Sequence, residues 1–370
     1  MSNTNPEDYF KTPTILNDLV SYVNLKELYV CQAGQFETNQ YTRFKYLKNK
    51  IVVAYWPEYN EHAYLEDVLK FSKEYFDRTG KLNNYFIFLS VHDYEPELKE
   101  KYSDFFTLIV DPLLYAYFTE TKDIPNIALE PKIDKKLHFL ALNSRASIAR
   151  QSLYYFFKKY NLQEKSYFTY HGNLKKGAAF KSYDQIADIC TNNNPPWYLA
   201  DLDLYELNKK IPVTIAGDNF GGNDWSPGTD FYYPDTFCSL VFEAYDDNTQ
   251  AHLTEKSFKA IAFYHPFIIY SNPGTLKVLQ DLGFKTFGDF WDESYDSLSA
   301  HHRLEAVFRL VLEISNWSQE KINQVYNKML PILEHNHNHF FQLSNLFNAT
   351  KPELYSRIKT IAESKKGLLG

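Results

Sequence analysis

The alternation of short apolar runs with helical segments constrains the fold of this chain more than any other feature. The runs are rich in β-branched and aromatic residues, and four of them lie at 27–31, 51–55, 85–90 and 105–110. Between the second and the third run, apolar residues in 62–76 recur at helical spacing. Strands that alternate with helices build βαβ units, so we predict an α/β fold with a largely parallel sheet.

The same alternation begins again after a segment that reads as a domain boundary. Residues 124–136 hold two prolines and a cluster of charges, and an apolar strand is expected directly after them at 137–142. A turn and a helix follow, and further strands are expected at 166–170 and 237–243. We therefore expect a second α/β domain. The predicted division is a first domain at 1–130, a second domain at 131–345, and a tail at 346–370.

Length, charge and cysteine usage exclude several classes of protein. A chain of 370 residues suffices for two domains, and its formal net charge of −7 gives no electrostatic footprint of a nucleic-acid-binding protein. The three cysteines, Cys31, Cys190 and Cys238, lie far apart without a CxxC pair, which excludes a disulfide framework or a cysteine zinc site. The sequence shows no signal peptide and no apolar run long enough to span a membrane, so we expect a cytoplasmic protein.

A strand followed by a short helix predicts an anion-binding site. The strand ends on a carboxylate, Glu243. Further on, Thr254 is a good N-cap, which places Glu255 and Lys256 in the first helical turn. A lysine at a helix N-terminus opposes the macrodipole, and with free backbone N–H groups it makes a concentrated positive site that an anion relieves. The alternative is that the lysine extends into solvent and that its glutamate neighbour merely suits the helix dipole.

The sequence around this helix resembles a known family of enzymes. The segments FEAY, TEKSFKAIAF and HPFIIYSNPG resemble the donor-binding segment of fucosyltransferase-type glycosyltransferases, above all of their bacteriophage and viral members. The resemblance is tight over 237–274, looser over 137–150 and 284–291, and absent from the N-terminal third. At 284–291 it implies a short strand followed by a loop.

The resemblance implies a GT-B-like fold, in which two Rossmann-like domains face across a cleft. The domain at 1–130 would then lie on the acceptor side, the domain at 131–345 would bind the nucleotide sugar, and the tail at 346–370 would cross back to the first domain. The resemblance also implies an inverting transfer of a sugar from a nucleotide sugar to an acceptor hydroxyl, with no metal and no other cofactor.

The resemblance assigns the cations that would bind the donor. Arg145 and Arg150 match an LN-x-R-x(4)-R pattern of the phage relatives, and in this fold an arginine there contacts the donor diphosphate. With Lys256 they would neutralise the leaving nucleoside diphosphate, where charge develops as the glycosidic bond breaks. The alternative is that both arginines are solvated residues at the start of a helix.

The same resemblance gives roles to neighbouring oxygen and amide groups. Glu243 and Glu255 would accept hydrogen bonds from ribose or sugar hydroxyls, and such charge-assisted bonds contribute roughly 1.5–3 kcal/mol each. Thr254 would support them from the helix start. Asn272 lies in the turn after the next strand and is expected close to the nucleotide.

An inverting transfer also needs a general base that deprotonates the acceptor hydroxyl. In two-domain transferases this base usually comes from the N-terminal domain. The candidates Glu58, His92, Asp93 and Glu95 all follow predicted strands of that domain, and each has the alternative of being a plain loop residue. We favour Asp93 and Glu95 as the catalytic residues.

Departures from the family pattern leave the substrates open. Ala244 and Tyr245 stand where the fucosyltransferase pattern has Asn-Ser, so the donor is expected to be either GDP-linked or UDP-linked, carrying a hexose or a pentose. The acceptor is expected to be a glycan or a modified DNA base, and the acidity of the chain argues mildly against DNA. The high aromatic content of 17% fits either rings that line a carbohydrate cleft or an A·T-rich coding bias.

Several alternative sites compete with this hypothesis. Asp201 and Asp203 form a DxD pattern that holds a metal in the other large glycosyltransferase fold, although ADLDLYEL reads as a helix start. His335 and His339 have the spacing of a metal pair, but solvated histidines at a helix end are the preferred interpretation. The irregular stretch 192–235 is a candidate for a lid over the site. A non-catalytic protein that binds a sugar nucleotide in the same fold is the functional alternative.

Overall fold

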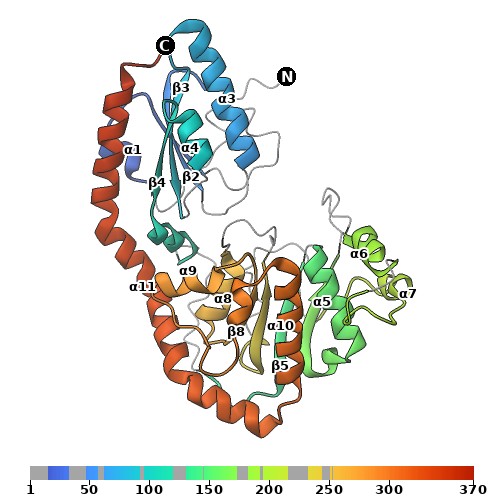
Figure 1. The fold of residues 1–370 in the computed structure, drawn as a ribbon. Helices are drawn as coiled ribbons and strands as arrows, with labels where there is room; N and C mark the ends of the chain where they lie inside the picture. The colour runs from blue at the N-terminus through green and yellow to red at the C-terminus, as the bar shows by residue number, and fades with distance from the viewer. Residues whose placement is uncertain are drawn as a thin grey trace. The chain divides into compact units, whose positions relative to one another are not determined.

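The chain folds into two units, seen in a computed structural model (Figure 1). The first unit comprises Met1–Thr121 and Phe341–Gly370, and the second comprises Lys122–Phe340. The sequence placed the corresponding boundaries after residues 130 and 345. The structure describes residues 16–32, 47–56, 62–91, 96–119, 131–144, 146–172, 182–191, 195–215, 232–243, 251 and 253–370.

The first unit is built on a four-stranded parallel sheet with the strand order β1-β2-β3-β4. Its strands are β1 (Leu28–Gln32), β2 (Lys50–Trp56), β3 (Asn84–Ser90) and β4 (Phe106–Val110). Its helices are α1 (Leu19–Val23), α3 (His62–Thr79), α4 (Pro96–Tyr102), the 3-10 helix η3 (Pro112–Thr119) and the part of α11 (Gln319–Lys366) that begins at Phe341. After α11, the last residues of the chain pair with Leu82, which donates to the carbonyl of Leu368 at 2.9 Å.

The second unit holds another four-stranded parallel sheet, whose order is β6-β5-β7-β8. Its strands are β5 (Leu137–Asn143), β6 (Ser166–Tyr170), β7 (Thr236–Phe242) and β8 (Phe267–Tyr270). The helices around it are α5 (Ile148–Lys159), η4 (Leu162–Lys165), α6 (Ser182–Thr191), α7 (Leu204–Asn208), α8 (Glu255–Ala262), α9 (Thr275–Asp281), η6 (Ser294–Ser297), α10 (Ala300–Ser315) and α11 up to Phe340. The predicted α/β class with two parallel sheets is confirmed.

Strand order gives the second sheet a topological switch point. The chain passes from β5 to β6 on one side and then crosses to β7 on the other side. The paired residues of β5 and β7 end at Leu140 and Ser239, whereas the strands themselves continue to Asn143 and Phe242. In open parallel sheets, ligands bind outside the carboxyl ends of the strands at such a point.

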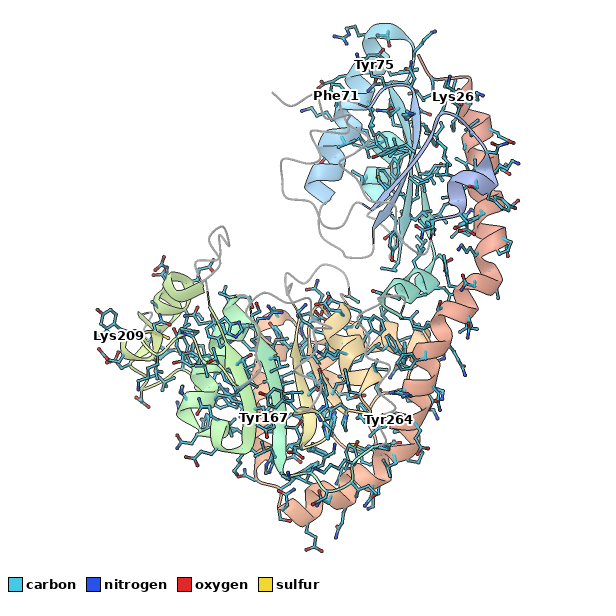
Figure 2. All side chains as sticks on the ribbon, turned by 180° about the vertical axis from the view of Figure 1, so that it is seen from behind. Lys26, Phe71, Tyr75, Tyr167, Lys209 and Tyr264 are labelled. Atoms are coloured by element: carbon cyan, nitrogen blue, oxygen red, sulfur yellow. The ribbon has the colours of Figure 1, made fainter. Side chains whose placement is uncertain are left out.

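Side chains are crowded around this sheet (Figure 2), and aromatic rings from its strands and helices pack on one another. From α5, Tyr154 stacks on Tyr170 with a centroid distance of 5.5 Å, and Phe157 stacks on Phe168 at 4.5 Å. The ring of Phe156 lies nearly parallel to that of Phe308 at 4.2 Å, which joins α5 to α10. Such large apolar surfaces contribute strongly to the stability of the second unit.

One predicted element is absent. Residues 284–291, expected to begin with a short strand, instead form turns in which Phe290 and Trp291 donate backbone hydrogen bonds to the carbonyl of Phe287. The rings of Phe287 and Trp291 are buried and 5.3 Å apart. The strand was expected from the resemblance to the phage relatives, and apolar residues that pack on one another across a turn take its place in this chain.

Within the part of the chain that the structure describes, no helix has the length and hydropathy needed to cross a membrane.

Candidate functional site

The start of α8 is bound to the carboxyl end of β7 through Glu243. This carboxylate, 2% exposed, follows directly after β7. Its Oε1 accepts hydrogen bonds from the backbone N–H of Thr254 at 3.0 Å and from the hydroxyl of Ser257 at 2.8 Å. Its Oε2 accepts a 2.6 Å hydrogen bond from the hydroxyl of Thr254. These three bonds fix the position of the helix start relative to the edge of the sheet.

Lys256 lies beside this helix start, as the sequence predicts. Thr254 is the N-cap, and its hydroxyl oxygen accepts hydrogen bonds from the backbone N–H of Lys256 at 3.3 Å and from its Nζ at 3.2 Å. The ammonium also forms an ion pair with Glu255. Both charged side chains are partly exposed, by 28% for Lys256 and 13% for Glu255, so a ligand in solvent can reach them.

The groups at the start of α8 that can bind an anion differ from those that the sequence predicted. The sequence suggested that free N–H groups would face an anion, but the N–H groups of Thr254 and Lys256 already donate to acceptors of the protein. The carboxylate of Glu243 is itself the anion at this helix start. The side-chain ammonium of Lys256, rather than those two N–H groups, is therefore what this helix start offers to a ligand.

Arg150 lies beside the carboxyl end of β7. It lies in the first turn of α5, is 2% exposed, and donates from Nε to the carbonyl oxygen of Phe242 at 2.9 Å and also from Nη2. Phe242 lies beyond the last paired residues of these strands, so the guanidinium binds a carbonyl at the end of β7. The sequence placed Arg150 at this edge, and the structure shows it there with its guanidinium bonded to the backbone.

Asn272 lies after β8 at the same edge of the sheet. It is fully buried, and its carbonyl accepts a 2.7 Å hydrogen bond from the hydroxyl of Thr275. Gly274 adopts a φ of 80°, the left-handed region that favours glycine, and its N–H donates to the carbonyl of Asp296 at 2.9 Å. The turn after β8 is therefore held rigidly near the switch point.

Sequence reasoning assigned Asn143 no role of its own, yet the structure places it at the centre of this edge. Asn143 is the last residue of β5, and its backbone N–H donates to the hydroxyl of Thr169 at 3.1 Å. Its carbonyl accepts from the N–H of His171, which follows β6. The carboxyl edge thus carries Asn143, His171, Glu243 and Asn272 at the ends of four neighbouring strands. A polar residue directly after a buried run in the first strand of a domain is the signal that could have identified it.

Several predicted site residues lie outside the described residues. These are Arg145 and the four candidates for the general base, Glu58, His92, Asp93 and Glu95. Part of the lid candidate at 192–235 lies outside them as well. Their assignments stay predictions.

The residues of the competing metal-site predictions form other contacts in the structure. Asp203 is the N-cap of α7 and accepts a 3.0 Å hydrogen bond from the N–H of Glu206, as ADLDLYEL suggested. The sequence predicts that His335 and His339 are solvated, but both rings contact the backbone. Their Nε2 atoms lie 2.9 and 2.6 Å from the carbonyl oxygens of Gly283 and Leu282. Among the residues described, no group of three or more His, Cys, Asp or Glu is arranged to hold a metal ion.

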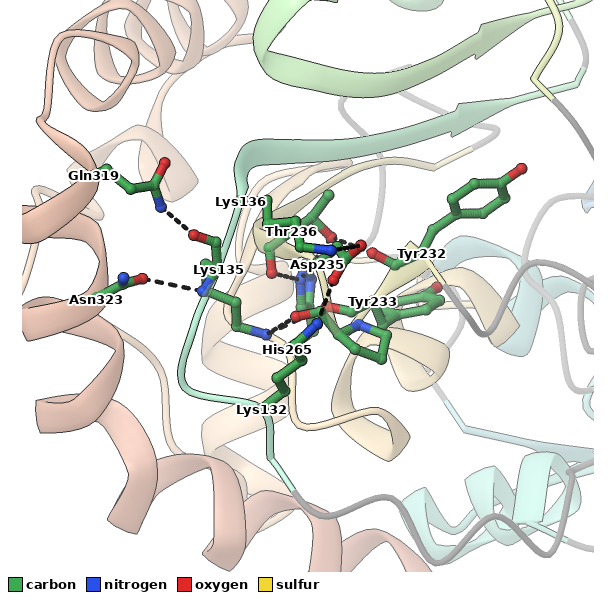
Figure 3. A network of polar contacts seen from close by, with 11 residues as sticks. Lys132, Lys135, Lys136, Tyr232, Tyr233, Asp235, Thr236, His265, Gln319 and Asn323 are labelled. Atoms are coloured by element: carbon green, nitrogen blue, oxygen red, sulfur yellow. Dashed lines mark hydrogen bonds and ion pairs between the residues drawn. The ribbon is translucent and has the colours of Figure 1, made fainter.

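A second polar cluster lies at the opposite, amino edge of the sheet (Figure 3). Lys135, just before β5, donates from Nζ to the carbonyls of Tyr233 and Pro234, each at 3.2 Å, and its ammonium lies 4.0 Å from the ring centroid of Tyr326. Burial lowers the pKa of Lys135 to about 7. Within the described part of the chain, the ammonium therefore donates to carbonyl oxygens and makes no hydrogen bond to a carboxylate.

His265 lies in the same cluster, before β8. Its ring nitrogens are 2.6 Å from the hydroxyl of Ser239 and 2.7 Å from the carbonyl of Thr236. Complete burial, together with the nearby Lys135 ammonium, holds the pKa of His265 well below its ordinary value, so the ring is neutral near pH 7. This cluster ties β5, β7 and β8 together at the edge away from the switch point.

Solved structures resemble this chain only remotely. No family model matches the chain, and no curated protein matches it. Among solved structures, a glycosyltransferase from Rickettsia africae ESF-5 is 12% identical, with a TM-score of 0.38 over 97% of this chain and 83% of that one. A trehalose-6-phosphate synthase is also 12% identical, with a TM-score of 0.35 over 94% of this chain and 84% of that one. At TM-scores this low we base no conclusion on either likeness.

Proposed function

We propose that this chain is a glycosyltransferase that moves a sugar from a nucleotide-sugar donor to an acceptor hydroxyl. One observation carries the proposal: Glu243 fixes the start of α8 so that Lys256 lies at the carboxyl edge of a parallel sheet that has a switch point. A cation at such an edge suits a phosphorylated ligand. The resemblance of FEAY, TEKSFKAIAF and HPFIIYSNPG to a donor-binding segment supports a nucleotide sugar as that ligand.

In this proposal, Lys256 and Glu255 exchange partners when the donor binds. Without ligand, the two side chains form an ion pair. A donor diphosphate competes with the carboxylate for the ammonium, and the released carboxylate of Glu255 accepts hydrogen bonds from ribose or sugar hydroxyls. One pair of neighbouring residues thereby binds the two chemically different parts of the donor.

The chemical step follows from the same arrangement. The acceptor oxygen attacks the anomeric carbon, the bond from that carbon to the diphosphate oxygen breaks, and the bonding electron pair leaves with the diphosphate. The charge on the leaving group grows in the transition state, so Lys256 stabilises the transition state more than the ground state. The acceptor proton passes to a general base, for which Asp93 and Glu95 are the predicted residues. Arg145 is the predicted second cation.

The proposal is tested with a thermal-shift screen of GDP- and UDP-linked sugars, followed by titration calorimetry. A true donor at a hundredfold excess over its Kd stabilises the folded chain by roughly 2.7 kcal/mol. Replacing Lys256→Ala removes a charge-assisted bond of about 1.5–3 kcal/mol, which raises the Kd roughly ten- to hundredfold. Lys277→Ala is the matched control, because Lys277 is 66% exposed and forms an i,i+4 pair on α9. Its affinity should equal that of the wild type.

Other results would lead to other conclusions. Unchanged affinity in both Lys256→Ala and Glu255→Ala would remove the donor site from α8. Binding without turnover, whichever glycan or modified-DNA acceptor is supplied, would identify a non-catalytic sugar-nucleotide-binding protein. Activity that EDTA abolishes would favour a metal-dependent transferase, for which Asp201 and Asp203 are the residues to replace first.

A further inference from the structure

The side chain of Asn143 is buried without a hydrogen-bond partner among the residues that the structure describes. Asn143 is 2% exposed, and neither its Oδ1 nor its Nδ2 is paired within that part of the chain. Its backbone is in contrast well satisfied, because the N–H donates to Thr169 and the carbonyl accepts from His171, each at 3.1 Å. Exchanging the positions of Oδ1 and Nδ2 would not change this conclusion, because both atoms are unpaired.

An unpaired amide in this position needs a physical explanation. The three preceding residues of β5 are Leu140, Ala141 and Leu142, so an apolar residue would continue the strand without an unpaired polar group. Leaving a buried donor and a buried acceptor unpaired is unfavourable, because each group loses its hydrogen bonds to water and gains none in return. Buried polar groups in folded proteins are almost always paired, so an exception calls for an explanation, and a role in a functional site is one of them.

The position of Asn143 indicates that its side chain serves ligand binding. It ends β5 at the switch point, where the pairing of β5 with β7 has already stopped. At the same edge, Glu243 accepts three hydrogen bonds and Arg150 donates to the carbonyl of Phe242, so these two side chains are engaged by the protein itself. Asn143 differs from both, because its amide has donor and acceptor capacity that the described residues do not use.

The chemistry of an amide selects among the parts of a nucleotide sugar. A carboxamide offers a donor and an acceptor side by side. Ionised phosphate oxygens only accept, so a diphosphate would pair with Nδ2 and leave Oδ1 unpaired. Two neighbouring hydroxyl groups satisfy both atoms, one accepting from Nδ2 and the other donating to Oδ1.

We propose that Asn143 binds a pair of neighbouring hydroxyl groups on the donor, either those of the ribose or those of the transferred sugar. The inference rests on the proposed function and extends it by naming a residue that binds a sugar. Because the amide is closed to solvent in the free chain, the ligand must displace the groups that cover it. A site with such an amide discriminates strongly against analogues that lack the hydroxyl, since they leave the buried amide unpaired.

The test compares two buried asparagines of the second unit. Asn336 is 1% exposed and fully paired, with its Oδ1 accepting from the N–H of Lys285 and its Nδ2 donating to the carbonyl of Lys285, both at 2.8 Å. Leucine has the same branching at Cγ as asparagine. We expect Asn336→Leu to lower the thermal midpoint by several degrees, because it breaks two hydrogen bonds and leaves the Lys285 backbone unpaired. Asn143→Leu should leave the midpoint unchanged or higher.

Titration calorimetry then identifies the hydroxyls, with GDP, UDP, their 2′-deoxy forms, and GDP- and UDP-linked sugars as probes. If Asn143 binds the ribose, the wild type loses at least about tenfold in affinity for the 2′-deoxy probe, and Asn143→Leu binds both forms equally. If it binds the transferred sugar, Asn143→Leu loses at least about tenfold for the nucleotide sugar and keeps its affinity for the nucleoside diphosphate. Asn336→Leu should bind every probe as the wild type does.

Three outcomes overturn the inference. The first is an Asn143→Leu protein with wild-type affinity for all probes that the wild type binds. The second is an equal loss for every probe, inorganic pyrophosphate included, which would assign the amide to the diphosphate. The third is an Asn143→Leu protein that unfolds or is clearly destabilised, provided that Asn143→Ala is destabilised too. A wild-type chain that binds none of the probes instead contradicts the proposed function itself.

Discussion

The two parallel sheets of this protein have the same number of strands but different strand orders. In the first unit the order β1-β2-β3-β4 follows the chain, so successive strands are always added on the same side. In the second unit the order β6-β5-β7-β8 reverses at β5, and the strands on either side of the reversal separate before they end. Only a reversal leaves an opening at the carboxyl edge, since crossover connections then leave the sheet in opposite directions. Among the described residues, the candidate site lies at that reversal.

The two units also differ in the kind of polar side chain that they bury. In the described part of the first unit, the buried polar side chains are neutral, namely Ser72, Asn83, Asn84 and Ser90. The second unit buries ionisable side chains that include Lys135, His138, Arg150, His171, Glu243, Lys259, His265 and Arg303. Burial of a charged group is unfavourable unless it is paired. The second unit therefore depends on specific hydrogen bonds, whereas the first depends mainly on apolar packing.

The largest effect is expected at Glu243. Glu243→Gln keeps the shape of the side chain but replaces one accepting oxygen with an NH₂ group. Thr254 and Ser257 together supply three donors to the two carboxylate oxygens, so the NH₂ group faces a donor and at least one hydrogen bond is lost. Hydrogen bonds to a charged group contribute about 1.5–3 kcal/mol, so we expect a loss of that size in the free energy of unfolding, with weaker donor binding as α8 loosens. Urea denaturation and titration with the identified donor measure the two effects. An unchanged unfolding midpoint would show that Glu243 does not fix the helix start.

An intermediate effect is expected from pH through His265. The unfolded chain binds a proton on this ring near pH 6.5, whereas the folded chain does not, because burial lowers the pKa. Stability therefore falls as the pH decreases through that value, by up to about 1.4 kcal/mol per pH unit for one such group. His265→Gln, which does not titrate, should flatten the dependence of the urea midpoint between pH 7 and pH 5. A residual slope is expected from His138 and His337, whose pKa values burial also lowers.

The smallest effect, and one of opposite sign, is expected at Asp111 after β4 in the first unit. Its Oδ1 accepts a 2.9 Å hydrogen bond from the N–H of Leu113, and burial raises the pKa of the carboxyl above its ordinary value of 3.8. The substitution Asp111→Asn keeps a hydrogen-bond acceptor in place and removes a partly buried charge. We expect a slightly higher unfolding midpoint at pH 7, with the difference vanishing below pH 3.8, where the penalty on the charged form is absent. If Asp111→Asn lowered the unfolding midpoint as much as Glu243→Gln does, the carboxylates after β4 and β7 would contribute equally to stability, and the contrast between the two units would not hold.

The fold was largely predictable because its signals are local. Strands such as 166–170 and helices such as α8 were located by runs and spacings of apolar residues, and Thr254 was correctly predicted as an N-cap. The expectation that came from the resemblance was wrong at 284–291, where Phe287 and Trp291 pack on each other in a turn. Packing between residues a few positions apart is a tertiary fact that period and propensity do not contain.

The site was predictable only as a set of positions. The sequence brought Glu243, Thr254, Glu255 and Lys256 together, because a strand end and a helix start that follow one another in a βα unit lie at the same edge. It did not reveal that Glu243 is used to fix α8, that Arg150 binds the carbonyl of Phe242, or that the amide of Asn143 is unpaired among the described residues. Each of these depends on which partner lies across space.

By itself, the sequence determined the elements of this protein and the residue types at their ends, since these follow from periodicity, capping and strand alternation along the chain. The tertiary structure decided the strand order β6-β5-β7-β8, and with it the switch point and the hydrogen-bond partners of the polar groups described there. Strand order depends on the side to which each crossover turns, a choice made by packing of whole elements. A carboxylate and an amide at two strand ends look alike in sequence, and only their surroundings make Glu243 a structural anchor and leave the amide of Asn143 for a ligand.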